Sequence, residues 1–246
     1  MFPILLEQNF FYQDNKQLIK SQTKPIRYSY FRSSCSYRVR IALNWKQIPY
    51  DYVAVNLVQK EQFSESYSAK NPLHEVPALE IDGHLLTQSH AIIEYLEETR
   101  SSEEQAPPLL PKDPFQRAQV RQVVNAIGAI QTVQNLKILN KYAADAANQS
   151  SSTVDERKKH WANHWITTYF SSLEKLLSMT SSGAGLYCVG DQVTMADLFL
   201  VPQVYNARRW GVDMSAFPLI EAIDKRLCGL PAFQKAHPDV QPDSPK

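Results

Sequence analysis

The sequence predicts an α/β domain followed by an all-α domain, and three observations lead to this fold class. Short runs rich in β-branched and aromatic residues alternate with helical patterns only over residues 25–104. The polar, proline-rich stretch SSEEQAPPLLPKD at residues 101–113 is typical of a linker. Beyond it, apolar residues recur at helical spacing without convincing strand alternation. We therefore expect two domains, residues 25–104 and 105–243, after a flexible extension over residues 1–24.

The first half of the α/β domain is predicted to contain a strand, a helix and a second strand. Residues 26–30, with the sequence IRYSY, are β-branched and aromatic and predict the first strand. The helix is predicted by apolar residues at helical spacing, namely Val39, Ala42, Leu43 and Trp45. The second strand is expected at residues 52–55, and the polar segment 60–70 should form a partly helical connection.

The second half of this domain is predicted to be a β-hairpin followed by a helix. Asp82-Gly83 separates two short apolar runs, residues 78–81 and 84–87, and this arrangement is typical of a hairpin turn. Ser89 is a good N-cap for the amphipathic helix that follows. The order β-α-β-α-β-β-α, with parallel and antiparallel pairing mixed, is that of a thioredoxin-like domain.

The second domain is predicted to be entirely helical. Helices are expected over residues 114–142, 154–179, 195–209 and 217–228, with a short one near residue 231. The strongest start signal is a capping box between Thr194 and Asp197, supported by a hydrophobic staple between Val193 and Leu198. Thr153 provides an N-cap for the second of these helices.

The composition is that of an ordinary globular protein whose charges balance. The 246 residues include 26 Lys and Arg against 25 Asp and Glu, and 43% are hydrophobic. Without an excess of either charge, no strong field would attract nucleic acid or an anionic membrane. No apolar run approaches the roughly 20 residues that a spanning helix needs. We therefore expect neither nucleic acid nor a membrane among the partners.

The cysteines and the N-terminus favour a cytoplasmic location. Cys35, Cys188 and Cys228 are widely spaced, odd in number and without a CxxC pair, which favours free thiols in a reducing compartment. The apolar patch at residues 2–6 is broken at once by Glu7, so the chain lacks the apolar core of a secretory signal.

Several common kinds of site are not expected. The sequence has no GxGxxG, Walker or GxSxG motif, and its seven glycines leave few phosphate-binding loops, which argues against a nucleotide cofactor. His160 and His164 are spaced as in a zinc protease, but no glutamate lies between them and no third ligand is evident. We therefore predict no metal site.

The segment YSYFRSSCSYRVRIAL at residues 28–43 carries the chemistry. Ser33, Ser34 and Cys35 stand where the first strand has ended and the helix begins. A helix N-terminus presents unpaired amides and a partial positive charge, so it stabilises an anion placed there. Taken alone, this segment favours a plain N-cap role for Ser33.

Two further features favour a ligand-binding site over a plain N-cap. Pro77 stands directly before an apolar strand, so a cis Val76-Pro77 bond is predicted, which would leave the Val76 backbone free to pair with an extended ligand. Gln88-Ser89 marks the start of the next helix, which is a second site for a carboxylate. Together these features predict a groove that fits a short acidic peptide.

These motifs resemble the zeta-class glutathione transferases. The resemblance rests on SSCSYRVRIAL, the Val-Pro at residues 76–77, Gln88-Ser89, IIEYLEE, and YCVGDQVTMADLFLVPQV, and it covers residues 25–243. It implies the glutathione transferase fold, a homodimer, and an enzyme with glutathione as its cofactor. Small anionic organic acids are the expected second ligand.

The resemblance also implies roles for individual residues. The γ-glutamyl group of glutathione should meet Gln88 and Ser89, its cysteinyl backbone should pair with Val76, and its glycyl end should lie near Gln62. The thiol should then lie at the catalytic residues Ser33, Ser34 and Cys35, with Ser33 as the principal hydroxyl.

Further residues are assigned to ligand binding by the same resemblance. Gln131 and Asn135, four apart on one face of the first long helix, should reach over the glutathione site. The other implied glutathione-binding residues are Ser36, Tyr37, Arg38, Leu136 and Lys137. Arg32 and Arg209 are expected to bind the carboxylates of a diacid substrate.

The implied activity is a glutathione-dependent cis-trans isomerisation. Maleylacetoacetate would be converted to fumarylacetoacetate in tyrosine and phenylalanine catabolism, with additional transferase activity on substrates that include small α-haloacids. Two alternatives stay open. Cys35 could act as the nucleophile of a thiol transferase or dehydroascorbate reductase, or the chain could be a non-catalytic interaction module with the same fold.

Overall fold

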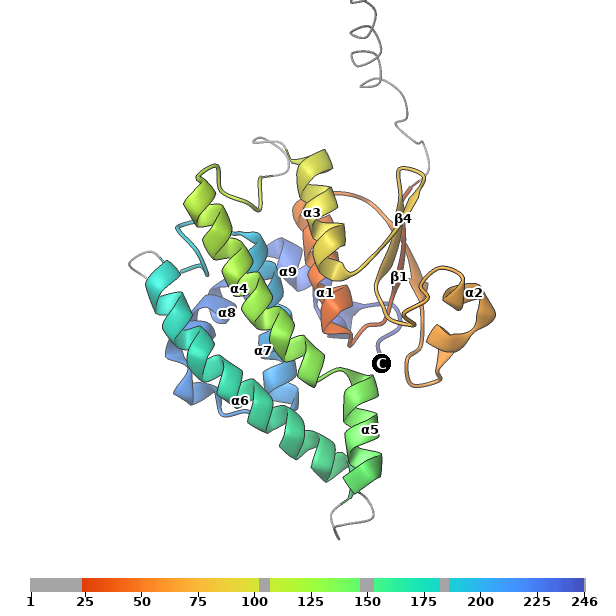
Figure 1. Ribbon diagram of the computed structural model, residues 1–246. Helices are drawn as coiled ribbons and strands as arrows, with labels where there is room; N and C mark the ends of the chain where they lie inside the picture. The colour runs from red at the N-terminus through yellow and green to blue at the C-terminus, as the bar shows by residue number, and fades with distance from the viewer. Residues whose placement is uncertain (1–23, 102–106, 147–152, 182–185, 246) are drawn as a thin grey trace, which may run out of the picture.

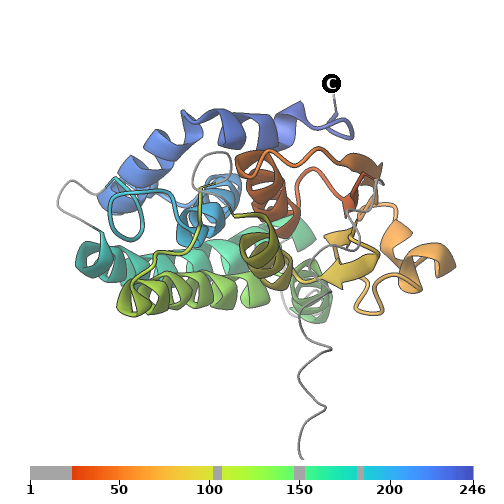
Figure 2. The same ribbon diagram turned by 90° about the horizontal axis from the view of Figure 1, so that it is seen from above.

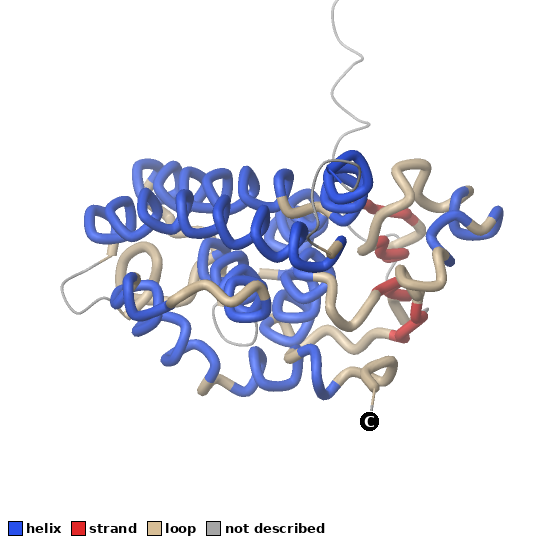
Figure 3. Tube along the Cα trace, turned by 90° about the horizontal axis from the view of Figure 1, so that it is seen from below, coloured by secondary structure: helices blue, strands red, loops and turns tan. Residues whose placement is uncertain are grey.

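A four-stranded sheet lies along one side of the molecule, and helices fill the rest of it (Figures 1 and 3). The structure is a computed structural model that describes residues 24–101, 107–146, 153–181 and 186–245. The predicted extension therefore lies outside the described residues, apart from Lys24. Within the described part of the chain, no helix is long and apolar enough to cross a membrane.

The sheet confirms the predicted thioredoxin-like arrangement, with strand order β2-β1-β3-β4. β1 (Ile26–Ser29) pairs in parallel with β2 (Asp51–Ala54) and antiparallel with β3 (Ala78–Ile81), which continues into β4 (His84–Thr87). The hairpin turn has positive φ at both central residues, 54° at Asp82 and 77° at Gly83. These angles are those of the type I′ turn that Asp-Gly favours.

Three α-helices and a single 3₁₀ turn accompany the sheet. α1 (Ser34–Trp45) and α3 (Ser89–Arg100) lie on the side that faces the helical domain, and α2 (Glu65–Ser68) lies on the other side with a 3₁₀ turn at Glu61–Phe63 (Figure 1). α1 is the most enclosed of these, because nine of its twelve residues are buried. Its N-terminus opens toward the helical domain.

The predicted N-cap of α3 is wrong by one position. Ser89 is the first helical residue, and the cap is Gln88, which has a φ of 67° and makes no side-chain capping bond. The Ser89 hydroxyl instead accepts a hydrogen bond from Arg38 of α1. A tertiary partner has therefore replaced the local capping bond that the sequence favours.

The second domain contains helices α4 to α9. Their bounds are Pro114–Val133 for α4, Leu136–Ala146 for α5, Val154–Thr180 for α6, Met195–Arg209 for α7, Pro218–Cys228 for α8 and Pro231–Ala236 for α9. α4 and α6 pack side by side, while α8 and α9 run along the opposite side and return the chain to the sheet (Figure 2). Single 3₁₀ turns lie at Met214–Ala216 and Pro238–Val240.

The prediction of one helix over residues 114–142 is wrong. α4 ends at Val133, and α5 begins only at Leu136. The break occurs at Asn135, whose side-chain oxygen accepts a hydrogen bond from the Lys137 amide at 2.9 Å. Asn competes for backbone amides in this way at helix starts, so it restarts the helix in a new direction.

The capping box predicted at Thr194 and the N-cap predicted at Thr153 are both present, and Thr153 also forms a capping box. Thr153 caps α6 with Glu156 as its partner. At the start of α7, the fully buried Asp197 carboxylate accepts bonds from the Thr194 amide at 2.7 Å, the Thr194 hydroxyl at 2.9 Å and the Cys188 amide at 2.9 Å. Asp197 thus ties the preceding loop to the helix start.

A buried carboxylate joins the two domains. Glu97 of α3 accepts hydrogen bonds from Lys46 at 2.7 Å, Ser101 at 2.8 Å, and the backbone amides of Leu109 at 3.0 Å and Leu110 at 3.1 Å. Burial alone would raise the pKa of Glu97, but the bonds from Lys46, Leu109 and Ser101 outweigh it and hold the pKa below its ordinary value. One carboxylate therefore accepts bonds from Lys46 of the α/β domain and from the Leu109 and Leu110 amides of the linker.

We predict that Glu97→Gln lowers the free energy of unfolding by about 3 kcal/mol, because Lys46 is left buried without its counter-charge. Urea denaturation measures this change. The matched control is Glu98→Gln, since Glu98 is the exposed neighbour on the same helix and should change stability by less than about 0.5 kcal/mol. Equal effects of the two substitutions would contradict a stabilising role for the ion pair between Lys46 and Glu97.

The stability supplied by Glu97 should also depend on pH. Because its folded pKa lies below that of the unfolded chain, its contribution is fully present above the unfolded pKa of about 4.3 and is lost as the pH falls through the folded pKa. The difference in unfolding free energy between the wild type and Glu97→Gln should therefore be constant near neutral pH and shrink in acid. Urea midpoints over a pH series test this, and a difference that stays constant in acid would refute it.

Candidate active site at the N-terminus of helix α1

A cavity of about 650 Å³ opens where α1 begins, between the α/β domain and the helical domain. This volume is in the range of pockets that enclose a small-molecule ligand. Its walls come from the loop after β1, the loop before β3, the start of α3, and helices α4, α5 and α7. The pocket therefore depends on contacts between both domains.

Most of the predicted site residues line this cavity. They are Arg32, Ser33, Ser34, Cys35, Arg38, Gln62, Val76, Gln88, Ser89, Gln131, Asn135, Leu136, Lys137 and Arg209. Ser36 and Tyr37 do not line it, because their side chains are buried elsewhere along α1. The Tyr37 ring packs edge-on against Tyr205 and His237, with ring centroids 6.3 and 6.1 Å away.

The two serines at the start of α1 have different hydrogen bonds. Ser33 is the N-cap, and its hydroxyl oxygen accepts from the Ser36 amide at 3.2 Å. The Ser34 hydroxyl donates to Gln131 of α4 at 2.8 Å. Among the described residues, the Ser33 proton has no acceptor, so this hydroxyl can donate to an anion in the pocket. The Ser34 proton is already engaged.

Arg38 places a buried positive charge beside Cys35. Its Nη1 donates to the Cys35 sulfur at 3.8 Å and to the Ser89 hydroxyl at 3.4 Å, and its guanidinium lies 4.2 Å above the Phe199 ring. Burial lowers the pKa of Arg38, which is only 3% exposed. Its Nε and Nη2 have no hydrogen-bond partner within the described residues. A buried cation with free donors is suited to receive an anionic ligand.

The opposite wall offers backbone and amide groups that are also unpaired. The Val76-Pro77 bond is cis, as predicted. No described residue pairs with the backbone N–H or C=O of Val76, and the buried side-chain oxygen of Gln62 lacks a hydrogen-bond partner in the same part of the chain. These groups fit an extended peptide-like ligand, because it can offer both donors and acceptors along its backbone.

Two arginines give the pocket a positive side. Arg209 of α7 and Arg32 of the loop after β1 both line the cavity. Desolvation and the nearby positive charge of Arg32 lower the pKa of Arg209. A carboxylate between the two guanidinium groups would relieve their repulsion and could accept hydrogen bonds from both.

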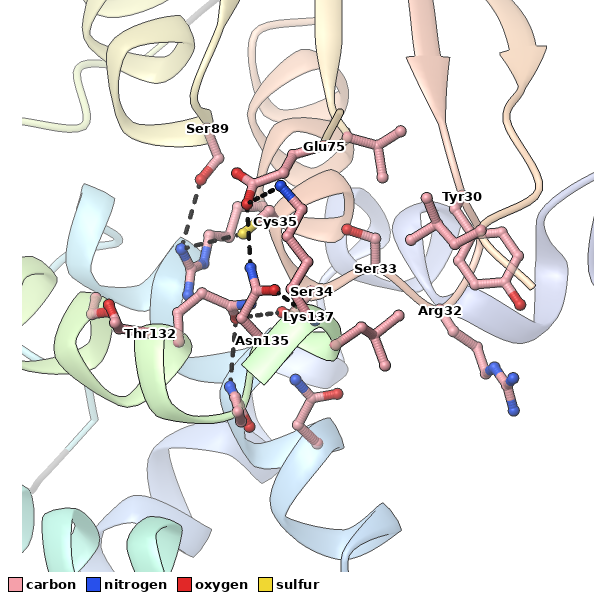
Figure 4. A pocket seen from close by; sticks show the side chains of 18 of the residues that line it. Tyr30, Arg32, Ser33, Ser34, Cys35, Glu75, Ser89, Thr132, Asn135 and Lys137 are labelled. Atoms are coloured by element: carbon pink, nitrogen blue, oxygen red, sulfur yellow. Dashed lines mark hydrogen bonds and ion pairs between the residues drawn. The ribbon is translucent and has the colours of Figure 1, made fainter. Parts of the chain in front are cut away.

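A cluster of polar groups bridges the two domains across the pocket (Figure 4). Asn135 donates to Glu75 at 3.2 Å, and Lys137 donates to the Leu73 carbonyl and lies 3.5 Å from the same Glu75 carboxylate. The expectation that Gln131 and Asn135 share one helix is therefore wrong, since Asn135 lies in the break after α4. Lys137 is bound to protein groups of the facing domain.

Glu75 is the main lining residue that the sequence did not single out. It stands directly before Val76 in the segment NPLHEVP, and this position beside the cis bond is the signal that could have identified it. His74, His90 and Phe199 also line the cavity. Phe199 lies within a continuously buried helix, so its pattern alone indicated only core packing.

Comparison with known proteins relates both halves of this site to one family. The glutathione S-transferase N-terminal domain family matches residues 28–105, and the C-terminal domain family matches residues 137–235. A Drosophila melanogaster protein named probable maleylacetoacetate isomerase 2 is 50% identical over 228 residues, which are 92% of this chain and 92% of the relative. The Mus musculus maleylacetoacetate isomerase is 49% identical and covers 90% of this chain and 96% of its own length.

Solved structures agree with this assignment. A maleyl pyruvate isomerase, described as a bacterial zeta-class glutathione S-transferase, superposes with a TM-score of 0.81 at 39% identity and covers 89% of this chain and 100% of its own. A maleylacetoacetate isomerase from Anaeromyxobacter dehalogenans superposes with a TM-score of 0.77 at 40% identity and covers 90% and 98%. The chain therefore belongs to the glutathione S-transferase family, in the zeta class that includes the maleylacetoacetate isomerases.

Proposed function

We propose that this chain is a glutathione-dependent isomerase that converts maleylacetoacetate to fumarylacetoacetate. The observation that carries the proposal is a pocket with a free hydroxyl donor at a helix N-terminus and two arginines that could hold carboxylates. Among solved relatives, one holds glutathione, one holds dicarboxyethyl glutathione with citrate, and one holds glutathione with malonate. In the second of these structures, the glutathione derivative and citrate both lie in the active site.

Glutathione would be held along its whole length. Its γ-glutamyl carboxylate would lie at the N-terminus of α3, near Gln88, Ser89 and the free donors of Arg38. Its cysteinyl backbone would pair with Val76, and its glycyl end would lie near Gln62. The unpaired groups on these residues support this orientation, because each would gain the hydrogen bond that it lacks.

Ser33 would stabilise the thiolate. The pKa of a free thiol is about 8.5, and the thiolate is the nucleophile. A hydrogen bond to a charged group contributes about 1.5–3 kcal/mol, and a helix N-terminus adds roughly 0.3–1. At about 1.36 kcal/mol for each pKa unit, these interactions bring the pKa of a bound thiol close to neutrality. No separate general base is then needed.

Arg32 and Arg209 would bind the carboxylates of the second substrate. When bound, glutathione supplies a thiolate that adds to the cis double bond and leaves after the resulting single bond has rotated, so it is not consumed. The arginines would hold the charged ends of the substrate near Ser33 while its centre rotates. A positive pocket in a chain of net charge +1 supports selection for acidic substrates.

A thiol transferase reaction through Cys35 is the second candidate. Cys35 is partly exposed in the same pocket, and its sulfur accepts a hydrogen bond from the Arg38 guanidinium. This reaction would form a mixed disulfide between Cys35 and glutathione.

Four further properties stay predictions of the family assignment. They are homodimerisation, a cytoplasmic location, a role in tyrosine catabolism and turnover of α-haloacids.

We predict that Ser33→Ala lowers kcat/KM for maleylacetoacetate by about 10-fold to 100-fold, because the substitution removes one hydrogen bond to a charged sulfur. The measurement is turnover with and without glutathione. The matched control is Ser34→Ala, whose hydroxyl is engaged by Gln131 and which should lose less activity. Full activity of Ser33→Ala, or wild-type turnover that does not need glutathione, would contradict the proposal.

The two candidate reactions predict opposite results for Cys35→Ala. An isomerase should keep most of its maleylacetoacetate turnover, since the glutathione thiolate is the nucleophile. A thiol transferase should lose its activity. Intact mass after treatment with oxidised glutathione gives a second readout, because only the transferase requires a glutathione adduct on Cys35. Loss of isomerisation in Cys35→Ala together with such an adduct would favour the second candidate.

A further inference from the structure

The loop between β1 and α1 is held by side chains from distant parts of the chain. This loop, residues 30–33, carries Arg32 and ends at Ser33. The Phe31 carbonyl accepts a hydrogen bond from Arg40 at 2.9 Å. The Phe31 amide donates to the Asp243 carboxylate at 2.9 Å, across 212 positions in the sequence. The backbone on both sides of Phe31 therefore depends on two charged groups.

Asp243 is itself held in a defined position. The buried Gln241 side chain donates to the carbonyls of Lys235 at 3.0 Å and His237 at 2.9 Å, which folds the tail after α9. Arg40 donates to the Ala236 carbonyl at 2.7 Å, so the residue that holds Phe31 also holds α9. The segment that carries Asp243 is therefore held beside the loop by a connected set of hydrogen bonds.

The second oxygen of the Asp243 carboxylate is also used. It accepts a hydrogen bond from the hydroxyl of Tyr52, which lies in the edge strand β2. Burial and this bond raise the pKa of Tyr52, so its hydroxyl keeps its proton and acts as the donor. Asp243 therefore bonds to β2 through one oxygen and to the active-site loop through the other.

A buried cation, Arg27, lies close to Asp243. Arg27 is fully buried, with its guanidinium 4.5 Å from the centres of both the Tyr50 and Tyr52 rings. Its three guanidinium nitrogens have no hydrogen-bond partner among the described residues. Burial lowers the pKa of Arg27, and the negative charge of Asp243 partly opposes that effect. The carboxylate thus offsets a buried cation while it binds the loop.

We propose that Asp243 is a positioning residue for the active-site hydroxyl. By fixing the Phe31 amide, it sets the direction in which the chain enters α1 and hence where the Ser33 hydroxyl lies. This inference rests on the proposed function, because it assigns Ser33 to the thiolate. The C-terminal tail is then a part of the active site's support, although it does not line the pocket.

The test compares Asp243→Ala with Asp243→Asn. Alanine removes the acceptor of the Phe31 amide and should lower kcat by about 10-fold, while KM for glutathione changes by less than about 3-fold. Asparagine keeps an oxygen for Phe31 and should restore most of kcat. The matched control is Asp239→Ala, because Asp239 is an exposed carboxylate of the same tail and should leave kcat unchanged.

Two further readouts separate positioning from a general loss of stability. In Asp243→Ala, the ultraviolet absorbance of the bound glutathione thiolate should appear at higher pH, because Ser33 no longer reaches the sulfur. Hydrogen exchange of the peptide that contains Phe31 should be faster, while the peptides of α6 are unchanged. If Asp243→Ala does not fold, Tyr52→Phe removes one bond of Asp243 and should shift the same readouts in the same direction, by less.

The outcomes distinguish this inference from the proposed function. Unchanged thiolate ionisation and loop exchange in a folded Asp243→Ala enzyme would overturn it, and so would a kcat loss that asparagine does not restore. A wild type without glutathione-dependent turnover would refute the proposed function instead. In that case, faster loop exchange in Asp243→Ala would still support the positioning of Phe31 by the tail.

Discussion

Helix α1 is buried on almost every side, and much of the structure follows from that constraint. Arg38 and Arg40 of this helix and Lys46 at its C-cap are only 3%, 0% and 4% exposed. A cation buried away from water is costly unless it is paired and hydrogen-bonded. Each of these side chains therefore needs partners from elsewhere in the fold. Lys46 pairs with Glu97, and Arg40 donates to three backbone carbonyls.

The three cations differ in how many of their hydrogen-bond donors have a partner. The cation with the fewest partnered donors is the one at the pocket. Lys46, at the far end of α1, has a carboxylate and further acceptors. Arg40, in the middle, donates to carbonyls from the active-site loop and α9. Among the described residues, Arg38 at the pocket donates hydrogen bonds only to the Cys35 sulfur and the Ser89 hydroxyl, and two of its nitrogens lack hydrogen-bond partners. An anionic ligand would supply the missing interaction.

The same tertiary contacts decide which groups at the site are free to react. Ser33 and Ser34 are adjacent and chemically identical, yet Gln131 of α4 engages one hydroxyl and leaves the proton of the other without an acceptor in the described structure. The break after α4 turns Asn135 and Lys137 toward Glu75, so that the two domains are joined across the pocket. The site is therefore a property of both domains together.

The sequence by itself determined the features that depend on neighbouring residues. The Asp82-Gly83 turn and the N-cap of α1 at Ser33 follow from local backbone preferences. The lining residues at the start of α1, Val76 and the Gln88-Ser89 pair belong to local motifs, whereas Gln131, Asn135 and Arg209 were assigned by the family resemblance. The reach of Asp243 to Phe31 and the hydrogen bond from Ser34 to Gln131 were decided only by the tertiary structure. The physical reason is that such bonds join groups far apart in the chain, whose partners no local pattern specifies.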